Sequence, residues 1–225
     1  LFSGMYYNRA VTDKTQMDAY VFARNARHNT GLEEDRFTLG GRYFGKCNDA
    51  LSFDSELAYQ FGDQEIGDKD IEAWMLTLEG TYAFADVAWT PAVTLGVDYA
   101  TGDDDAADSD VETFSHLYPL AHAYIGFADV VARQNIIDYR VSVAAKPIAK
   151  LLVRGDIHLL QLESKDDGLY GAAGTPSRAA ANEDDLGVEY DLITKYTISK
   201  HQDVLVGYSH FEAGDYIDDT GANED

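Results

Sequence analysis

The sequence has one cysteine, four prolines and few basic residues, and it has no long apolar run. Because Cys47 stands alone, no internal disulfide can form. The 17 Lys and Arg residues face 40 Asp and Glu residues, which gives a formal net charge of −23. Phosphate binding needs clustered basic side chains, so this balance argues against a nucleic-acid partner. No segment approaches the roughly 20 consecutive apolar residues of a membrane-spanning helix, which excludes a helical membrane protein.

Motifs of the common enzyme classes are also missing. The chain contains no Gly-x-Ser-x-Gly elbow, no His-Glu-x-x-His motif, no phosphate loop and no dinucleotide fingerprint. His116, His122 and His210 follow no spacing of metal ligands. Asp156 and His158 share one face of a predicted strand, but that spacing places them about 6.5–7 Å apart, too far for a direct hydrogen bond. We therefore predict that the protein is not an enzyme.

Ten stretches of alternating apolar and polar residues run through the chain. The clearest pair covers residues 74–84 and 89–99, where Trp74, Leu76 and Leu78 share one parity. Successive strand residues point to opposite faces, so each stretch has one apolar face with aromatic residues at both tips. Such a face suits a lipid bilayer, which roughly 9–11 tilted strand residues span between two aromatic girdles. The pattern predicts an all-β fold, an antiparallel up-and-down transmembrane β-barrel.

The connections between these stretches alternate between short and long. Strands are predicted at residues 2–9, 17–26, 35–45, 51–62, 71–84, 89–101, 136–146, 149–163, 186–199 and 202–213. Short connections are expected at 10–16, 46–50, 85–88, 147–148 and 200–201, and long ones at 27–34, 63–70, 102–135, 164–185 and from 214 onward. Outer-membrane barrels have short periplasmic turns and longer extracellular loops. The asymmetry therefore predicts a location in the bacterial outer membrane.

This strand order has a consequence for the two ends of the chain. The first strand would run inward and the tenth outward, so both ends would lie on the extracellular side. An unpaired strand edge within a membrane is costly. We therefore expect a single domain over residues 1–225 that is an internal piece of a longer barrel, without at least one strand at each end. Leu1 is not a start methionine, so we expect any export signal to have been removed or to lie outside this sequence.

The polar parity of each strand is expected to line the channel, because the lumen of such a barrel is polar. Two regions are ambiguous in parity, one where Tyr20 and Phe22 compete with Val21, the other where Tyr208 competes with Leu205. Opposite charges on neighbouring strands either pair to hold the wall, at about 0.2–1 kcal/mol each, or form rings that select ions and sugars. The predicted pore-lining residues are Arg36, Arg42, Asp54, Glu56, Glu79, Asp98, Asp138, Arg140, Lys146, Arg154, Asp156, His158, Glu189, Asp191 and Lys195.

Two loop segments suggest further roles. The acidic segment 102–110 supplies hard oxygen ligands for Ca²⁺, although it lacks the spacing and the final Glu of an EF-hand loop. The segment 114–135 is too apolar for a free extracellular loop. It either folds into the lumen and constricts it, or packs over the rim of the barrel with a helical turn near 127–133, and we favour the rim. The candidate Ca²⁺ ligands are Asp103, Asp104, Asp105, Asp108 and Asp110.

A succession of short segments carries a more specific signal. They are residues 97–103 (VDYATGD), 113–119 (TFSHLYP), 122–129 (HAYIGFAD), 133–135 (RQN), 145–147 (AKP), 156–159 (DIHL) and 207–216 (GYSHFEAGDY). This succession resembles the C-terminal half of the alginate-export family of outer-membrane porins. The likeness covers about residues 97–221 well, and the first ninety residues agree mainly in strand rhythm. It implies an eighteen-stranded barrel, with one more strand after the equivalent of Gly221, that passes an anionic exopolysaccharide or small solutes by diffusion.

The charges leave the transported solute open. An anionic polymer needs a basic track, which Arg36, Arg42, Arg140, Lys146, Arg154 and Lys195 would form. The predicted lumen nevertheless carries about as many carboxylates as bases, and the loops at its mouth are acidic. A field of that sign repels a uronate chain and attracts cations. A channel for neutral or cationic small solutes is therefore an equal expectation, with membrane lipid as the surrounding partner and no cofactor besides Ca²⁺.

A second function class stays open from the sequence. The protein would then be a structural or adhesive surface protein whose acidic loops bind Ca²⁺ or a protein partner. A third reading, a soluble β-sandwich, requires the apolar faces to be buried against a second sheet.

Overall fold

The computed structural model describes residues 1–26, 33–118, 120 and 124–221. His122 and parts of the predicted loops at 27–34 and 102–135 lie outside the described residues. Within the described residues, no helix has the length and apolar character needed to cross a membrane.

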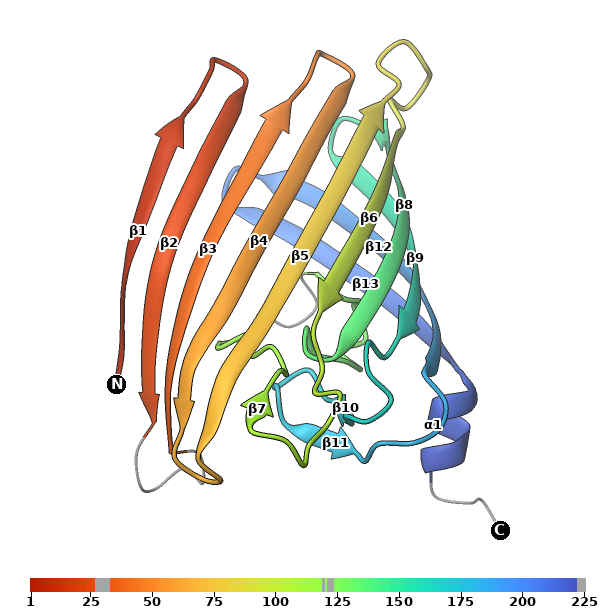
Figure 1. The fold of residues 1–225 in the computed structure, drawn as a ribbon. Coiled ribbons are helices and arrows are strands. Elements are labelled where there is room, and N and C mark those ends of the chain that lie inside the picture. Colours follow the sequence, from red (N-terminus) through yellow and green to blue (C-terminus); the bar gives the residue numbers. More distant parts are fainter. Residues whose placement is uncertain (27–32, 119, 121–123, 222–225) are drawn as a thin grey trace.

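Ten long antiparallel strands form one sheet, and strands that follow one another along the chain are paired in it (Figure 1). The only described segments of regular structure outside this path are two short strand pairings and one helix. Strand β7 (Asp110–Val111) pairs with β5, β10 (Leu169–Tyr170) pairs with β11 (Pro176–Arg178), and α1 covers Asp215–Thr220. The ten strands are β1 (Phe2–Ala10), β2 (Thr15–Ala26), β3 (Glu34–Lys46), β4 (Leu51–Gln64), β5 (Lys69–Ala83), β6 (Ala92–Ala100), β8 (Ile136–Ile148), β9 (Leu151–Gln161), β12 (Asp185–Ser199) and β13 (Gln202–Ala213).

The predicted all-β, up-and-down order is confirmed, and most strand bounds differ from the prediction by only a few residues. The sixth strand is the clearest exception, because it was predicted to begin at Trp89 and begins at Ala92. Trp89 and Thr90 have φ values of 69° and 44°, which are incompatible with a strand and place both residues in the turn. Helix α1 was not predicted, since the alternation ends before it.

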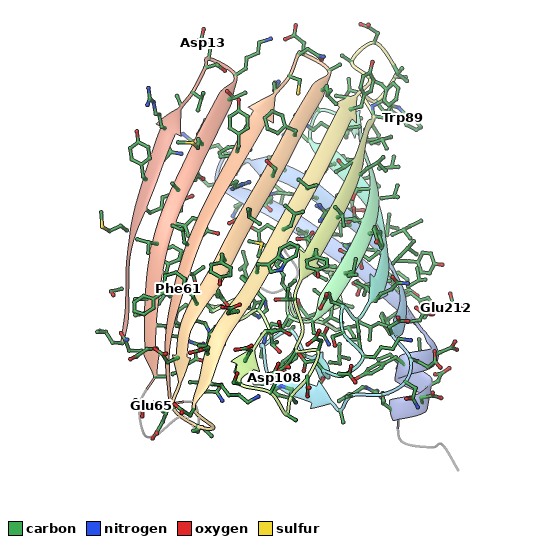
Figure 2. All side chains as sticks on the ribbon, in the orientation of Figure 1. Asp13, Phe61, Glu65, Trp89, Asp108 and Glu212 are labelled. Carbon is green, nitrogen blue, oxygen red and sulfur yellow. The ribbon has the colours of Figure 1, made fainter. Side chains whose placement is uncertain are left out.

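The short and long connections lie at opposite ends of the sheet, as the sequence predicts. Figure 2 labels Asp13 and Trp89 at the short-turn end, with Glu65 and Asp108 at the other end. The start of β1 and helix α1 also lie at the long-loop end (Figure 1). The sheet curves but does not close among the described residues, because β1 and β13 are its two outermost strands.

The two faces of the curved sheet differ in composition. We call the face contacted by residues 101–135 the inner wall and the opposite face the outer face. Large apolar side chains of the outer face are exposed, with Leu95 at 61%, Val206 at 62% and Tyr208 at 65%. Charged and polar side chains of the inner wall are buried instead, such as Asp138 at 0% and Asp156 at 4%. This arrangement is the reverse of a water-soluble sheet, which buries its apolar face.

The register settles the two strands whose parity was ambiguous. Tyr20 is opposite Gly40 and Phe22 is opposite Thr38, which places both rings on the inner wall. Tyr208 pairs with Leu192 on the outer face, since the neighbouring Asp191 faces the inner wall. Val21 and Tyr208 are therefore outer-face residues.

The inner wall is not polar over its whole length, which corrects the expectation from the sequence. Near the long-loop end its strands contribute small or apolar side chains that are buried. These pack against apolar residues of the loops and of α1, whose Tyr216 is 0% exposed. The loops cover this part of the wall, so burial there favours apolar contacts over hydration. The wall residues of this core are Ala58, Ala73, Met75, Ala100, Ile136 and Leu160.

Candidate functional site

The described residues of segment 101–135, which we call the inner loop, contact the inner wall rather than only its rim. Gln60 and Ser115 bond reciprocally: the Ser115 N–H donates to Gln60 Oε1 over 2.9 Å, and Gln60 Nε2 donates to the Ser115 carbonyl over 2.6 Å. Arg140 Nη1, on the inner-wall face of β8, donates to the carbonyl of Tyr124 over 3.0 Å. The preference for packing over the rim is therefore wrong, and the inward alternative describes the geometry.

Two carboxylates of β12 hold the middle of the inner loop. The Ala128 N–H donates to Glu189 Oε1 over 2.7 Å, and the Phe127 N–H donates to Asp191 Oδ2 over 2.9 Å. Gly126 has a φ of 78°, and a Cβ there would lie 2.5 Å from a Glu189 carboxylate oxygen. Only glycine fits this approach. The helical turn predicted near residues 127–133 does not form, since the backbone N–H groups bond to carboxylates of the wall.

An ion pair between Arg133 and Asp98 fixes the end of the inner loop. Arg133 Nη2 lies 2.5 Å from Asp98 Oδ1, and the Thr77 hydroxyl donates to the same oxygen over 2.7 Å. The Asp98 side chain is 2% exposed, and the Arg133 guanidinium lies 5.1 Å from the centroid of the Tyr124 ring. Asp98 was predicted to line the pore, whereas Arg133 was missed. The signals for Arg133 were a single cation within an apolar segment and its place in the 133–135 segment of the family resemblance.

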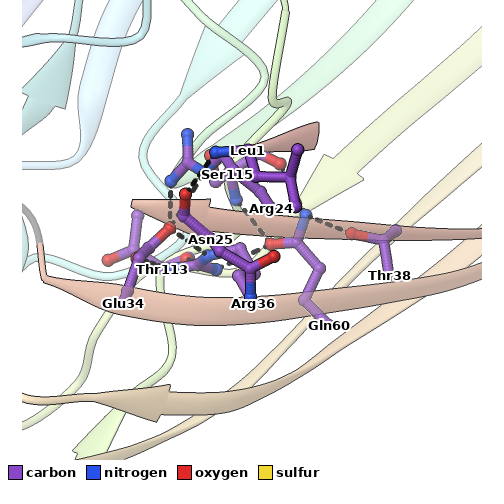
Figure 3. Close-up of polar contacts among 9 residues, drawn as sticks. All are labelled: Leu1, Arg24, Asn25, Glu34, Arg36, Thr38, Gln60, Thr113 and Ser115. Carbon is purple, nitrogen blue, oxygen red and sulfur yellow. Dashed lines mark hydrogen bonds and ion pairs between the residues drawn. The ribbon is translucent and has the colours of Figure 1, made fainter. Parts of the chain in front are cut away.

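The predicted basic residues of β3 are on the inner wall, but carboxylates neutralise them. Arg36 is buried, contacts Glu34 at 3.3 Å and donates to Gln60 Oε1 over 2.7 Å (Figure 3). Arg42 Nε donates to Asp54 Oδ1 over 2.7 Å. Arg42 thus pairs across neighbouring strands, whereas Arg36 pairs with a carboxylate two residues earlier on its own strand.

The remaining predicted basic residues follow the same pattern or lie away from the loop. Arg140 pairs with Glu79, and Arg154 Nε lies 2.8 Å from Asp156 Oδ2. Lys195 is exposed near the short-turn end, 3.3 Å from Asp203. Lys146 is exposed on the last part of β8. Each of the four arginines of the proposed basic track therefore faces a carboxylate.

The predicted acidic residues of β8, β9 and β12 gather around His158. Its Nδ1 lies 2.8 Å from Asp138 Oδ2, and its Nε2 lies 3.9 Å from Asp191 Oδ2. The expectation that Asp156 does not bond directly to His158 agrees with these partners. Glu189 is opposite His158 in the register, so it also faces this group. Glu56, on β4, accepts the Tyr20 hydroxyl over 2.6 Å.

A cavity of about 270 Å³ lies between the inner loop and this part of the wall. Tyr124 borders it on the loop side. Its polar lining includes Glu79, Arg140, Arg154, Asp156 and His158. The structure thus brings most of the predicted pore-lining residues of β5, β8 and β9 to one space. Positively and negatively charged groups surround that space. No arrangement of a nucleophile with a general base is present among these residues.

The acidic segment predicted to bind Ca²⁺ uses several of its carboxylates to order its own backbone. Asp103, Asp105 and Asp108 each accept a hydrogen bond from the N–H two residues further on. Burial raises the pKa of Asp103, and burial together with Asp104 raises that of Glu112. In the part of the chain that the structure describes, no three His, Cys, Asp or Glu side chains are grouped to hold a metal ion. Ca²⁺ binding by this segment stays a prediction.

His116 makes the inner loop sensitive to pH. Its Nδ1 accepts a hydrogen bond from the Arg133 N–H over 3.2 Å, and burial, followed by the charge of Arg133, lowers its pKa to about 4. An unfolded loop would bind a proton near the ordinary value of 6.5, so stability contributed by neutral His116 is lost as the pH falls from about 6.5 towards 4. We expect hydrogen exchange at the Arg133 amide, corrected for its intrinsic rate, to accelerate over this range.

The matched control is His116→Gln, which keeps a hydrogen-bond acceptor and does not titrate. The raised pKa values of Asp103 and Glu112 act in the opposite direction, but they do so in both proteins. The difference between the two exchange profiles therefore isolates His116. Identical pH profiles would remove the proposed sensitivity.

The fold and the wall define an all-β protein with up-and-down strands, apolar on its outer face and largely charged and polar on its inner wall. The chain belongs to the alginate export family, whose family model matches residues 1–224. The match includes the first ninety residues, which the sequence segments had related mainly by strand rhythm. The family description is one of transport, in agreement with the prediction that the protein is not an enzyme. No curated protein matches the chain.

Proposed function

We propose that this protein is a passive channel of the bacterial outer membrane, in which the inner wall and the inner loop control the passage of a polysaccharide or of small solutes. The exposed outer face carries the proposal. Leu95, Val206 and Tyr208 belong to a continuous apolar surface on long strands, which a water-soluble protein would not leave open. Lipid is the solvent that suits this surface, as in outer-membrane barrels.

The lengths and edges of the strands support a barrel wall. The ten long strands have 9 to 15 residues each, enough for the roughly 9–11 tilted residues that span a bilayer. The outermost strands β1 and β13 would leave backbone groups without partners in lipid. We therefore propose that further strands close this sheet into a larger barrel.

The charges of the inner wall favour neutral or cationic solutes over a polyanion. Its guanidinium groups are paired, and its carboxylates are more numerous than its guanidiniums together with Lys146 and Lys195 among the described strand residues. Such a wall has a negative field, which attracts cations and repels a uronate chain. The carboxylates are Asp18, Glu34, Asp54, Glu56, Glu79, Asp98, Asp138, Asp156, Glu189 and Asp191, and the guanidiniums are Arg24, Arg36, Arg42, Arg140 and Arg154.

The full-length protein is expected to conduct ions in planar lipid bilayers, with a preference for cations. Changing Arg140 and Arg154 together to Gln removes two positive charges from the cavity and should raise the cation-to-anion permeability ratio about twofold or more. Glu79→Gln is the matched control of opposite sign and should lower that ratio. Absence of conductance would refute the channel, whereas conductance with unchanged selectivity would refute the role of the two arginines.

A further inference from the structure

A row of aromatic side chains lies on the inner wall, where a polar lumen would be expected. Tyr6 is opposite Tyr20 in the register of β1 and β2, and Phe22 shares their face. Phe2 begins the same row, and Tyr118 of the inner loop meets it. We call these five residues the aromatic row. The ion pairs of the wall do not account for it.

The rings of the aromatic row form a continuous series of contacts. The ring centroids of Tyr6 and Tyr20 are 5.9 Å apart, and those of Tyr20 and Phe22 are 4.9 Å apart. Phe2 then lies 5.5 Å from Phe22 and 5.0 Å from Tyr118. These separations fall in the range of favourable aromatic pairs. The row thus extends from the strands to the inner loop.

A second cavity, of about 330 Å³, lies between the aromatic row and the inner loop. Tyr6, Tyr20 and Phe22 line it from the wall, and Phe114 and Tyr124 line it from the loop. Its volume is within the roughly 300–1,000 Å³ of small-molecule sites, which combine apolar and aromatic walls with a few polar groups.

The polar groups of this cavity include both signs of charge. Arg42, Arg133 and Glu56 line it together with the hydroxyl-bearing Thr38. Glu56 accepts the Tyr20 hydroxyl, and Arg42 is paired with Asp54 while its side chain stays 36% exposed. Arg133 is likewise paired, with Asp98, so the cavity offers hydrogen-bond donors and acceptors but no unpaired guanidinium.

We propose that the aromatic row binds the pyranose rings of a neutral oligosaccharide and is the sugar path of the channel. This inference rests on the proposed function and names its solute. A pyranose ring has an apolar C–H face that stacks on aromatic rings, and its hydroxyl groups need donors and acceptors at the edge. A uronate chain would require unpaired basic groups, which Arg42 and Arg133, each paired with a carboxylate, do not provide. An aliphatic solute would leave those two charged groups unused.

The test compares Phe22→Leu with Phe37→Leu in the full-length protein. Phe37 pairs with Phe61 and lies on the outer face. The two changes are therefore chemically identical but lie on opposite faces of the sheet. Maltohexaose and cellohexaose are titrated into each protein in detergent by calorimetry, and their block of the ion current is measured in planar bilayers. We expect Phe22→Leu to raise the dissociation constant about fivefold and Phe37→Leu to leave it unchanged.

A second variant, Tyr118→Leu, changes the exposed ring of the loop and leaves the strands intact, so it should weaken binding even if Phe22→Leu misfolds. If neither neutral sugar binds the unchanged protein, or if Phe22→Leu and Phe37→Leu bind equally, the sugar path is wrong. Tighter binding of a hexauronate that is insensitive to Phe22→Leu also overturns it. Sugar binding in detergent without conductance in bilayers would support the site and refute the channel.

Discussion

Asp98→Ala is expected to release the inner loop from the wall and to increase the single-channel conductance. Asp98 is 2% exposed and is the ion-pair partner of Arg133. Without it, the guanidinium of Arg133 would be buried and unpaired, at a cost of about 3–5 kcal/mol. If the inner loop leaves the wall, the Arg133 guanidinium becomes hydrated and that cost is avoided. Conductance steps in planar bilayers and protease cleavage within the loop would both report the release.

The control for this prediction replaces both charges with apolar groups. Asp98→Leu combined with Arg133→Met removes the pair without leaving either charge unpaired, a change that is often neutral or stabilising in other proteins. The double variant should therefore regain the lower conductance and the protease resistance of the unchanged protein. If Asp98→Ala leaves conductance and cleavage unaltered, the ion pair does not hold the loop.

The alternation of side chains predicted the strands because a period of two depends only on local sequence. It also predicted which charged residues face inward, such as Arg42 and Glu79. It failed at Trp89, where positive φ values start a turn within an alternating pattern. It failed again at Met75 and Ile136, whose inner-wall positions are apolar because a loop covers them. That covering segment follows β6 in the sequence, and alternation within strands carries no information about it.

The pairing within the site was less predictable than its composition. Arg133 and Asp98 are on different segments, and their contact depends on the path of the inner loop. Arg36 was predicted to face the lumen; it lies on the inner wall, where its contacts with Glu34 and Gln60 bury it. A single sequence gives residue types on each face, whereas partners follow from register and loop packing. The arginines of the predicted basic track therefore lie on the inner wall, but carboxylates pair with their guanidinium groups.

Leu95→Arg is expected to destabilise the folded protein in lipid by about 2–4 kcal/mol, because a cation on the lipid face near mid-bilayer has this cost. Leu95 is 61% exposed and lies near the middle of β6. On a face that meets water, such a surface change would alter stability by no more than about 0.5 kcal/mol. Lipid and water at the outer face thus predict clearly different losses of stability for this variant. The measurement is a urea titration of the full-length protein folded into phosphatidylcholine vesicles.

Thr94→Arg provides the matched control, since Thr94 is the preceding residue and lines the 270 Å³ cavity on the inner wall. An arginine there reaches a polar interior and should cost far less than one at position 95. Comparable small losses for both variants would show that water covers the outer face, and the channel proposal would then fail. A large loss confined to Leu95→Arg follows only if lipid contacts the outer face, because the two changes add the same charge one residue apart.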